Sequence, residues 1–194
     1  MNKKKITILL FAIVFSSFSV SANSIVEDEP ASTGIDYSGV NIFGAGLSLG
    51  YYSYGYYGTR SVSVPPLNVY LEFGLHEYIT AGPFGGYARW DYSRINNYNY
   101  NWSFYQFGAR GSFHLTSILN EVFGNTIDAE KVDWYIAIMS GLEYRSSDLF
   151  NNRTRIFFGP AVGIRYYIGN SLALYLEGGR GSLGALTFGL SASF

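Results

Sequence analysis

The chain has 194 residues, with 13 lysines and arginines against 14 aspartates and glutamates, and it has no cysteine. The lack of cysteine excludes disulfides and thiolate metal sites, and the lack of a basic stretch argues against nucleic-acid binding. Aromatic residues make up 19% of the chain and glycine occurs 23 times. This content is too aromatic for a disordered chain and suits β-strands that combine aromatic girdles with small residues.

The first 22 residues predict a secretory signal peptide. Lysines at positions 3–5 precede an apolar run over 6–18 and small residues up to Ala22, which is the order of a cleaved export signal. The apolar run is short for a membrane-spanning helix of about 20 residues. Cleavage would remove three lysines and no acidic residue, leaving 10 basic side chains against 14 acidic ones. The acidic, turn-rich residues 23–38 are expected to form a flexible lead-in.

From residue 39 onward, apolar residues recur at every second position in eight segments. Such alternation is typical of β-strands with one apolar face and one polar or small face. The predicted strands span residues 40–51, 67–75, 79–92, 102–115, 132–145, 154–166, 171–180 and 184–194. A helical turn is predicted from Ser117 to Phe123, within the connection 116–131.

Charged residues within these strands are expected on the face opposite to the apolar one. They are Glu72, Arg89, Asp91, Arg110, Glu143, Arg145, Arg155, Arg165 and Glu177. A soluble barrel would carry its charges outside, so this arrangement is inverted. An arginine or lysine facing lipid near the midplane costs about 2–4 kcal/mol. Because lipid offers the backbone no hydrogen bonds, the sheet must also close on itself. The pattern therefore predicts an all-β, eight-stranded antiparallel up-and-down transmembrane β-barrel over residues 39–194.

The connections indicate an orientation. Barrels of this kind have short periplasmic turns and longer external loops, so the connections 52–66, 93–101 and 146–153 are expected at the cell surface. The connection 116–131 is then long yet periplasmic, which departs from this rule.

The pattern resembles the small eight-stranded outer-membrane barrels of the OmpX-like and OmpA-barrel type, over about residues 39–194. The resemblance rests on the export signal, the strand count and the terminal Phe194 with its alternating apolar partners. The segment PLNVYLEFGLHEYITAGPFGGYARWDY also looks like the second hairpin of such barrels. The resemblance implies a protein of the Gram-negative outer membrane that contacts outer-membrane lipid. It also implies that the barrel-assembly machinery reads Phe194.

Three functions remain open. The favoured one is a monomeric structural or surface-binding protein, without catalysis, cofactor or metal, which binds a surface ligand through the three external loops. The alternatives are a narrow pore for ions or small solutes and a lipid A-modifying enzyme. A salt-bridged plug is expected in the lumen, because eight strands enclose barely enough room for their own side chains. The two histidines, His76 and His114, are expected at the periplasmic rim and are too few to predict a metal site.

Overall fold

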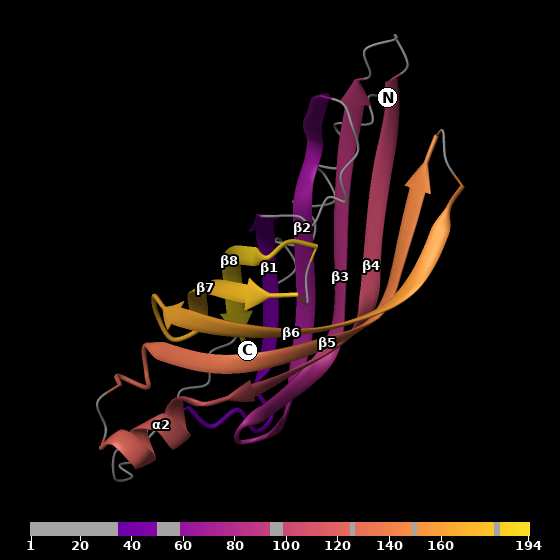
Figure 1. Cartoon of the computed structure of the whole chain (residues 1–194). Coiled ribbons are helices and arrows are strands. Elements are labelled where there is room, and N and C mark those ends of the chain that lie inside the picture. The colour runs from indigo at the N-terminus through magenta and orange to yellow at the C-terminus, as the bar shows by residue number, and fades with distance from the viewer. Residues whose placement is uncertain (1–34, 50–58, 94–98, 125–126, 149–150, 181–182) are drawn as a thin grey trace. The chain divides into compact units, whose positions relative to one another are not determined.

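The computed structural model describes residues 35–49, 59–93, 99–124, 127–148, 151–180 and 183–194. They form an all-antiparallel barrel in which each strand pairs with its sequence neighbours and β8 pairs with β1 (Figure 1). The strands are β1 (Asn41–Leu49), β2 (Thr59–His76), β3 (Ile79–Ser93), β4 (Asn99–His114), β5 (Val132–Ser147), β6 (Arg153–Tyr167), β7 (Leu172–Gly179) and β8 (Leu186–Ser193). The predicted fold class is confirmed. The helix α2 (Thr116–Phe123) lies between β4 and β5, where a helical turn was expected.

The main error in the predicted boundaries concerns β2, which has 18 residues and begins at Thr59. Residues 59–66 were expected to belong to a loop rich in tyrosine and glycine that ends at Pro66. In the structure Pro65 and Pro66 fall in a register shift between Val64 and Leu67, and a strand tolerates proline at such a bulge. The end residues of the predicted loops 93–101 and 146–153 also belong to strands. Residues 50–58, 94–98 and 149–150 lie outside the described residues.

The register staggers the strands around the barrel. Starting at Ile156 of β6 and stepping across paired residues through β5, β4, β3, β2, β1, β8 and β7 leads back to β6 at Tyr166, ten residues further on. A stagger of this kind tilts the strands relative to the barrel axis. We call the end where β1 stops at Leu49 the loop end, and the opposite end, where His76 precedes the turn to β3, the turn end. At the loop end, β2 to β6 continue past β1, β7 and β8 (Figure 1).

On seven strands, the face that was predicted to be apolar points outward and the opposite face points into the lumen. On β3 the two faces are the other way round from the prediction. Large apolar side chains cover the outside, as in the case of Ile138, which is 49% exposed. The inside holds buried polar and charged groups, including Glu72, Asp133 and Arg165. Among the described residues, no helix is both long and apolar enough to cross a membrane.

Glycines make room for the inward aromatic rings. Tyr70 lies directly across from Gly44 on the neighbouring strand, and Tyr135 lies across from Gly163. A Cβ atom at either glycine would overlap the ring opposite. The rings therefore lie flat over backbone that has no side chain, which is how a narrow barrel can hold large residues inside.

We predict that Gly163→Ala destabilises the barrel by about 1–3 kcal/mol, because the added methyl group must displace the ring of Tyr135. Gly85→Ala is the matched control, since a Cβ there would lie 3.5 Å from the Gln106 carbonyl oxygen and 3.9 Å from Val69. Urea unfolding of the two variants in the same detergent gives the comparison. Equal free energies of unfolding for the two variants would contradict the assignment of Gly163 as a space-making residue.

Candidate functional site

A network of ionic side chains occupies the lumen toward the turn end of the barrel. Its four central members come from four different strands: Glu72 from β2, Arg110 from β4, Arg165 from β6 and Glu177 from β7. Each has the sequence parity of the inward face of its strand, so the alternation of the sheet brings all four to the axis. All four are almost completely buried.

Glu72 is the centre of this network. Its carboxylate accepts a hydrogen bond from Arg110 Nε at 2.8 Å and another from Arg165 Nη2 at 3.1 Å, and Ser112 donates a third. Arg110 Nη2 also lies 2.7 Å from Glu177 Oε2, to which the Tyr135 hydroxyl donates. Acidic and basic groups thus alternate across the lumen. Each buried charge has an opposite partner, without which its desolvation would cost several kcal/mol.

The two arginines also lie over aromatic rings. The Arg110 guanidinium carbon is 4.4 Å from the centroid of the Tyr70 ring, and that of Arg165 is 4.2 Å from the centroid of the Tyr135 ring. Both distances fall within the range of cation–π attraction, which strengthens when the cation is desolvated. The glycine-backed tyrosines therefore hold the guanidinium groups in place as well as fill space.

At the turn end, the network continues from Arg165 to Asp133 and His114. Arg165 Nη1 lies 3.0 Å from Asp133 Oδ2, the His114 Nδ1 lies 2.9 Å from the same oxygen, and the other ring nitrogen lies 3.1 Å from the Thr80 hydroxyl. Carboxylate, imidazole and hydroxyl follow the order of a nucleophile relay. However, Thr80 is 0% exposed and the Tyr37 ring stacks on His114 at 3.6 Å. A substrate therefore has no access to the Thr80 hydroxyl. These contacts instead close the lumen at the turn end.

Two sequence predictions are corrected here. Tyr37 falls in the segment 23–38 that was expected to be flexible, yet it is buried and its N–H donates to the Glu77 carbonyl. Residues 23–34 lie outside the described residues. His114 is buried rather than at a wet rim, whereas His76 is exposed and contacts Tyr78.

A second cluster lies nearer the loop end, around Glu143 of β5. Its carboxylate accepts from Arg145 Nε at 2.6 Å, lies 2.8 Å from Arg155 Nε, and accepts from Gln106 at 3.1 Å. The Arg155 side chain is 50% exposed. Because water screens exposed charges, this cluster contributes less to stability than the Glu72 network.

Arg89 and Asp91 are not part of either network, which corrects their predicted place in the lumen. They lie on the outside of β3 and pair with each other at 3.4 Å, with side chains 41% and 45% exposed. Trp90, between them, points inward against Phe104. Where lipid surrounds a strand, its apolar residues face outward and its charged residues face the lumen. Toward the loop end, that constraint ends and water or headgroups can solvate outward charges.

Asp133 and Tyr37 belong to the network but were not predicted as members of it. Asp133 has the same parity as Tyr135 and Glu143 on β5, so the alternation contained a signal for its inward position. Tyr37 precedes the first strand, where no periodicity applies. Seven of the nine predicted lumen charges do point inward, in the two clusters around Glu72 and Glu143.

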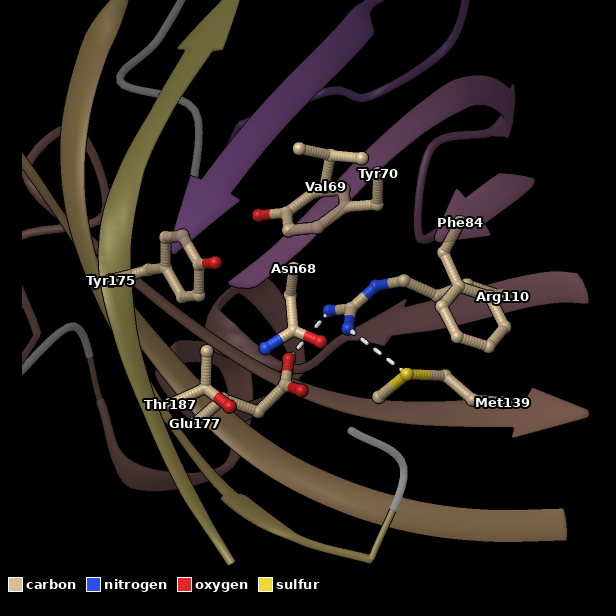
Figure 2. A pocket seen from close by; sticks show the side chains of 9 residues that line it. All are labelled: Asn68, Val69, Tyr70, Phe84, Arg110, Met139, Tyr175, Glu177 and Thr187. Carbon is tan, nitrogen blue, oxygen red and sulfur yellow. Dashed lines mark hydrogen bonds and ion pairs between the residues drawn. The ribbon is translucent and has the colours of Figure 1, made fainter. Parts of the chain in front are cut away.

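The lumen between these clusters is filled. Figure 2 shows Arg110 reaching toward Glu177 and Met139, with Tyr70 and Tyr175 beside them. A cavity lined by these residues measures about 10 Å³, which is room for one water molecule. In the described part of the chain, no three histidine, aspartate or glutamate side chains gather as a metal site would require.

A closed antiparallel barrel with an apolar exterior and an ionic interior is the architecture of a transmembrane barrel of the Gram-negative outer membrane. The chain has the fold of the small eight-stranded members of this class.

Comparison with known proteins agrees with this class. The fold is similar to that of the outer membrane protein OprG from Pseudomonas aeruginosa, with a TM-score of 0.51 and 7% identity over 84% of this chain and 98% of that one. Two further similar structures have lower TM-scores. The Yersinia pestis attachment invasion locus protein Ail, in complex with the heparin analogue sucrose octasulfate, gives 0.45 at 12% identity, covering 82% of this chain and 99% of that one. Neisserial surface protein A gives 0.43 at 15% identity, covering 79% and 92%. No protein-family model and no curated protein sequence matches the chain.

We predict that Arg165→Met lowers the free energy of unfolding by about 3–5 kcal/mol, because it leaves Glu72 and Asp133 short of a cation in a desolvated lumen. The matched control is Arg89→Met, which breaks an exposed pair and should cost about 1 kcal/mol or less. Urea titration in lipid bilayers, followed by tryptophan fluorescence, measures both. A loss at Arg165 no larger than the loss at Arg89 would show that the lumen network is not a stabilising plug.

Proposed function

We propose that this protein is a monomeric structural component of the outer membrane that binds a protein partner at the cell surface, without catalysis. The observation that carries the proposal is the extension of β2 to β6 at the loop end beyond β1, β7 and β8. Long connections belong outside the cell in such barrels, so this sheet would project toward the exterior. The binding element is then a sheet with its connections, rather than loops alone.

The projecting sheet has two open edges. Within the described residues, 59–66 of β2 pair only with β3, and 153–159 of β6 pair only with β5. Unpaired N–H and C=O groups along an edge can template a strand from another chain. Pro65 and Pro66 interrupt the first edge, which leaves the edge of β6 as the better site for an added strand.

The geometry of β6 identifies which groups face its edge. The Pro160 carbonyl accepts from the Arg180 N–H, on the β7 side. The even-numbered residues of β6 therefore direct their backbone N–H and C=O groups to the β7 side. The odd-numbered residues form hydrogen bonds to β5. Within the unpaired stretch 153–159 the even-numbered set comprises Thr154, Ile156 and Phe158, all of which are exposed. The exposed Arg153 beside Thr154 favours a partner segment that carries acidic residues.

The alternatives have less support. A narrow pore needs a continuous water path, whereas the cavity beside Arg110 and Glu177 holds about one water molecule. Steady conductance of the refolded protein in a planar bilayer would favour the pore. A lipid A-modifying activity would appear as altered lipid A mass spectra in cells that carry the protein. We also propose, from the resemblance to small outer-membrane barrels, that the barrel-assembly machinery recognises Phe194.

We predict that Ile156→Pro reduces attachment of bacteria that display the protein to epithelial cells, because proline removes an N–H from the open edge while leaving the ladder to β5 intact. Ile156→Val is the matched control and should attach as the parent does. Heat-modifiable gel migration verifies that each variant forms a barrel. If the proline variant folds and attaches as well as the parent, recognition through the β6 edge is wrong.

A further inference from the structure

The connection between β4 and β5 contains a feature that neither the lumen nor the projecting sheet explains. It is long although it lies at the turn end, where connections are usually short. Within it, α2 runs from Thr116 to Phe123 and ends at Gly124, whose φ of 78° is left-handed. Glycine adopts this conformation without strain, which stops the helix after two turns.

Two polar residues of α2, Thr116 and Asn120, face the protein. They are the buried residues of α2, and they lie four positions apart, on one face of the helix. The Thr116 hydroxyl oxygen accepts from the Trp134 N–H at 2.7 Å. The Asn120 amide donates to the Ile127 carbonyl and accepts from the Ile127 N–H, both at 2.9 Å. These bonds fix the rotation of the helix about its axis.

Two apolar residues in the last turn of α2, Val122 and Phe123, face away from the barrel. Val122 is 68% exposed and Phe123 is 65% exposed, and Ile118 and Leu119 are partly exposed. At 100° per residue, these four side chains fall on one arc of about 140°, and Ser117 and Glu121 lie on the opposite side of the helix. A helix surrounded by water has its apolar side turned to the protein. In α2, by contrast, two polar residues, Thr116 and Asn120, are buried, and the apolar Val122 and Phe123 are exposed.

This apolar arc continues the outer surface of the barrel. Phe113 precedes the helix on β4, and Trp134 and Ile136 lie on the adjoining part of β5, all with exposed side chains. Trp134 is held next to Thr116 by the backbone bond described above. Tryptophan is enriched where lipid tails meet headgroups. The helix is thus attached at the level where the lipid-facing wall ends.

We propose that α2 is an interfacial helix that lies on the membrane at the turn end of the barrel and inserts Val122 and Phe123 into the lipid. The partner is the phospholipid surface, since the arc is continuous with the lipid-facing wall. An amphipathic helix in this position buries its apolar side at the boundary between headgroups and acyl chains. The length of the connection follows from this role, which rests on the membrane-spanning barrel.

Nitroxide labelling tests the proposal directly, because the chain has no cysteine and one introduced cysteine is the sole attachment site. Labels at Val122→Cys and Glu121→Cys, in protein reconstituted into phosphatidylcholine bilayers, are compared by collision with oxygen and with a water-soluble nickel chelate. Oxygen concentrates in lipid and the chelate stays in water. The label at position 122 should collide more with oxygen and several-fold less with the chelate than the label at 121.

A label at Ile138→Cys, on the lipid-facing wall, reports whether the barrel itself is inserted. Suppose that the label at position 138 contacts lipid while the label at position 122 collides with the chelate as often as the label at 121 does. The proposal of an interfacial helix is then wrong, whereas the membrane-spanning barrel is supported. Shielding of position 122 from both reagents would also overturn the proposal, in favour of a protein cover. If position 138 is open to the chelate, the membrane-spanning barrel fails, and the proposal for α2 fails with it.

Discussion

A bilayer offers the polypeptide backbone no hydrogen-bond partners, and this constraint governs the structure. Eight strands meet it by closing on themselves, with β8 paired to β1. Closure leaves each strand one face toward lipid and one toward a narrow lumen, so charged residues have a place only inside wherever lipid surrounds the strand. The same constraint explains α2, whose polar residues Thr116 and Asn120 turn to the protein.

The lumen imposes a second condition, because ions taken out of water need partners. Glu72 meets it by receiving two guanidinium groups, and Arg110 links it to Glu177. The tyrosines over which these guanidinium groups lie fit only because glycine occupies the position across from each ring. Charge pairing, aromatic packing and glycine placement are thus one solution to filling a tube eight strands wide, and they leave room for little else.

The sequence predicts those parts of the structure in which lipid decides the side-chain direction. Arg110 and Glu177 belong to strands with clear alternation, so their inward direction could be predicted directly. Arg89 and Asp91 lie toward the loop end, where lipid no longer sorts residues, and the same rule placed them wrongly. The pairing of Glu72 with Arg165 depends on the ten-residue stagger around the barrel, and the alternation within each strand carries no information on that stagger.

The account depends on the apolar wall facing lipid. The most direct measurement is refolding of the processed protein from urea, in buffer alone and with phospholipid vesicles, followed by migration of the unheated sample on a gel. The account predicts that the compact, faster-migrating barrel forms only when vesicles are present. A compact, monomeric and soluble β-structure formed in buffer alone would contradict it.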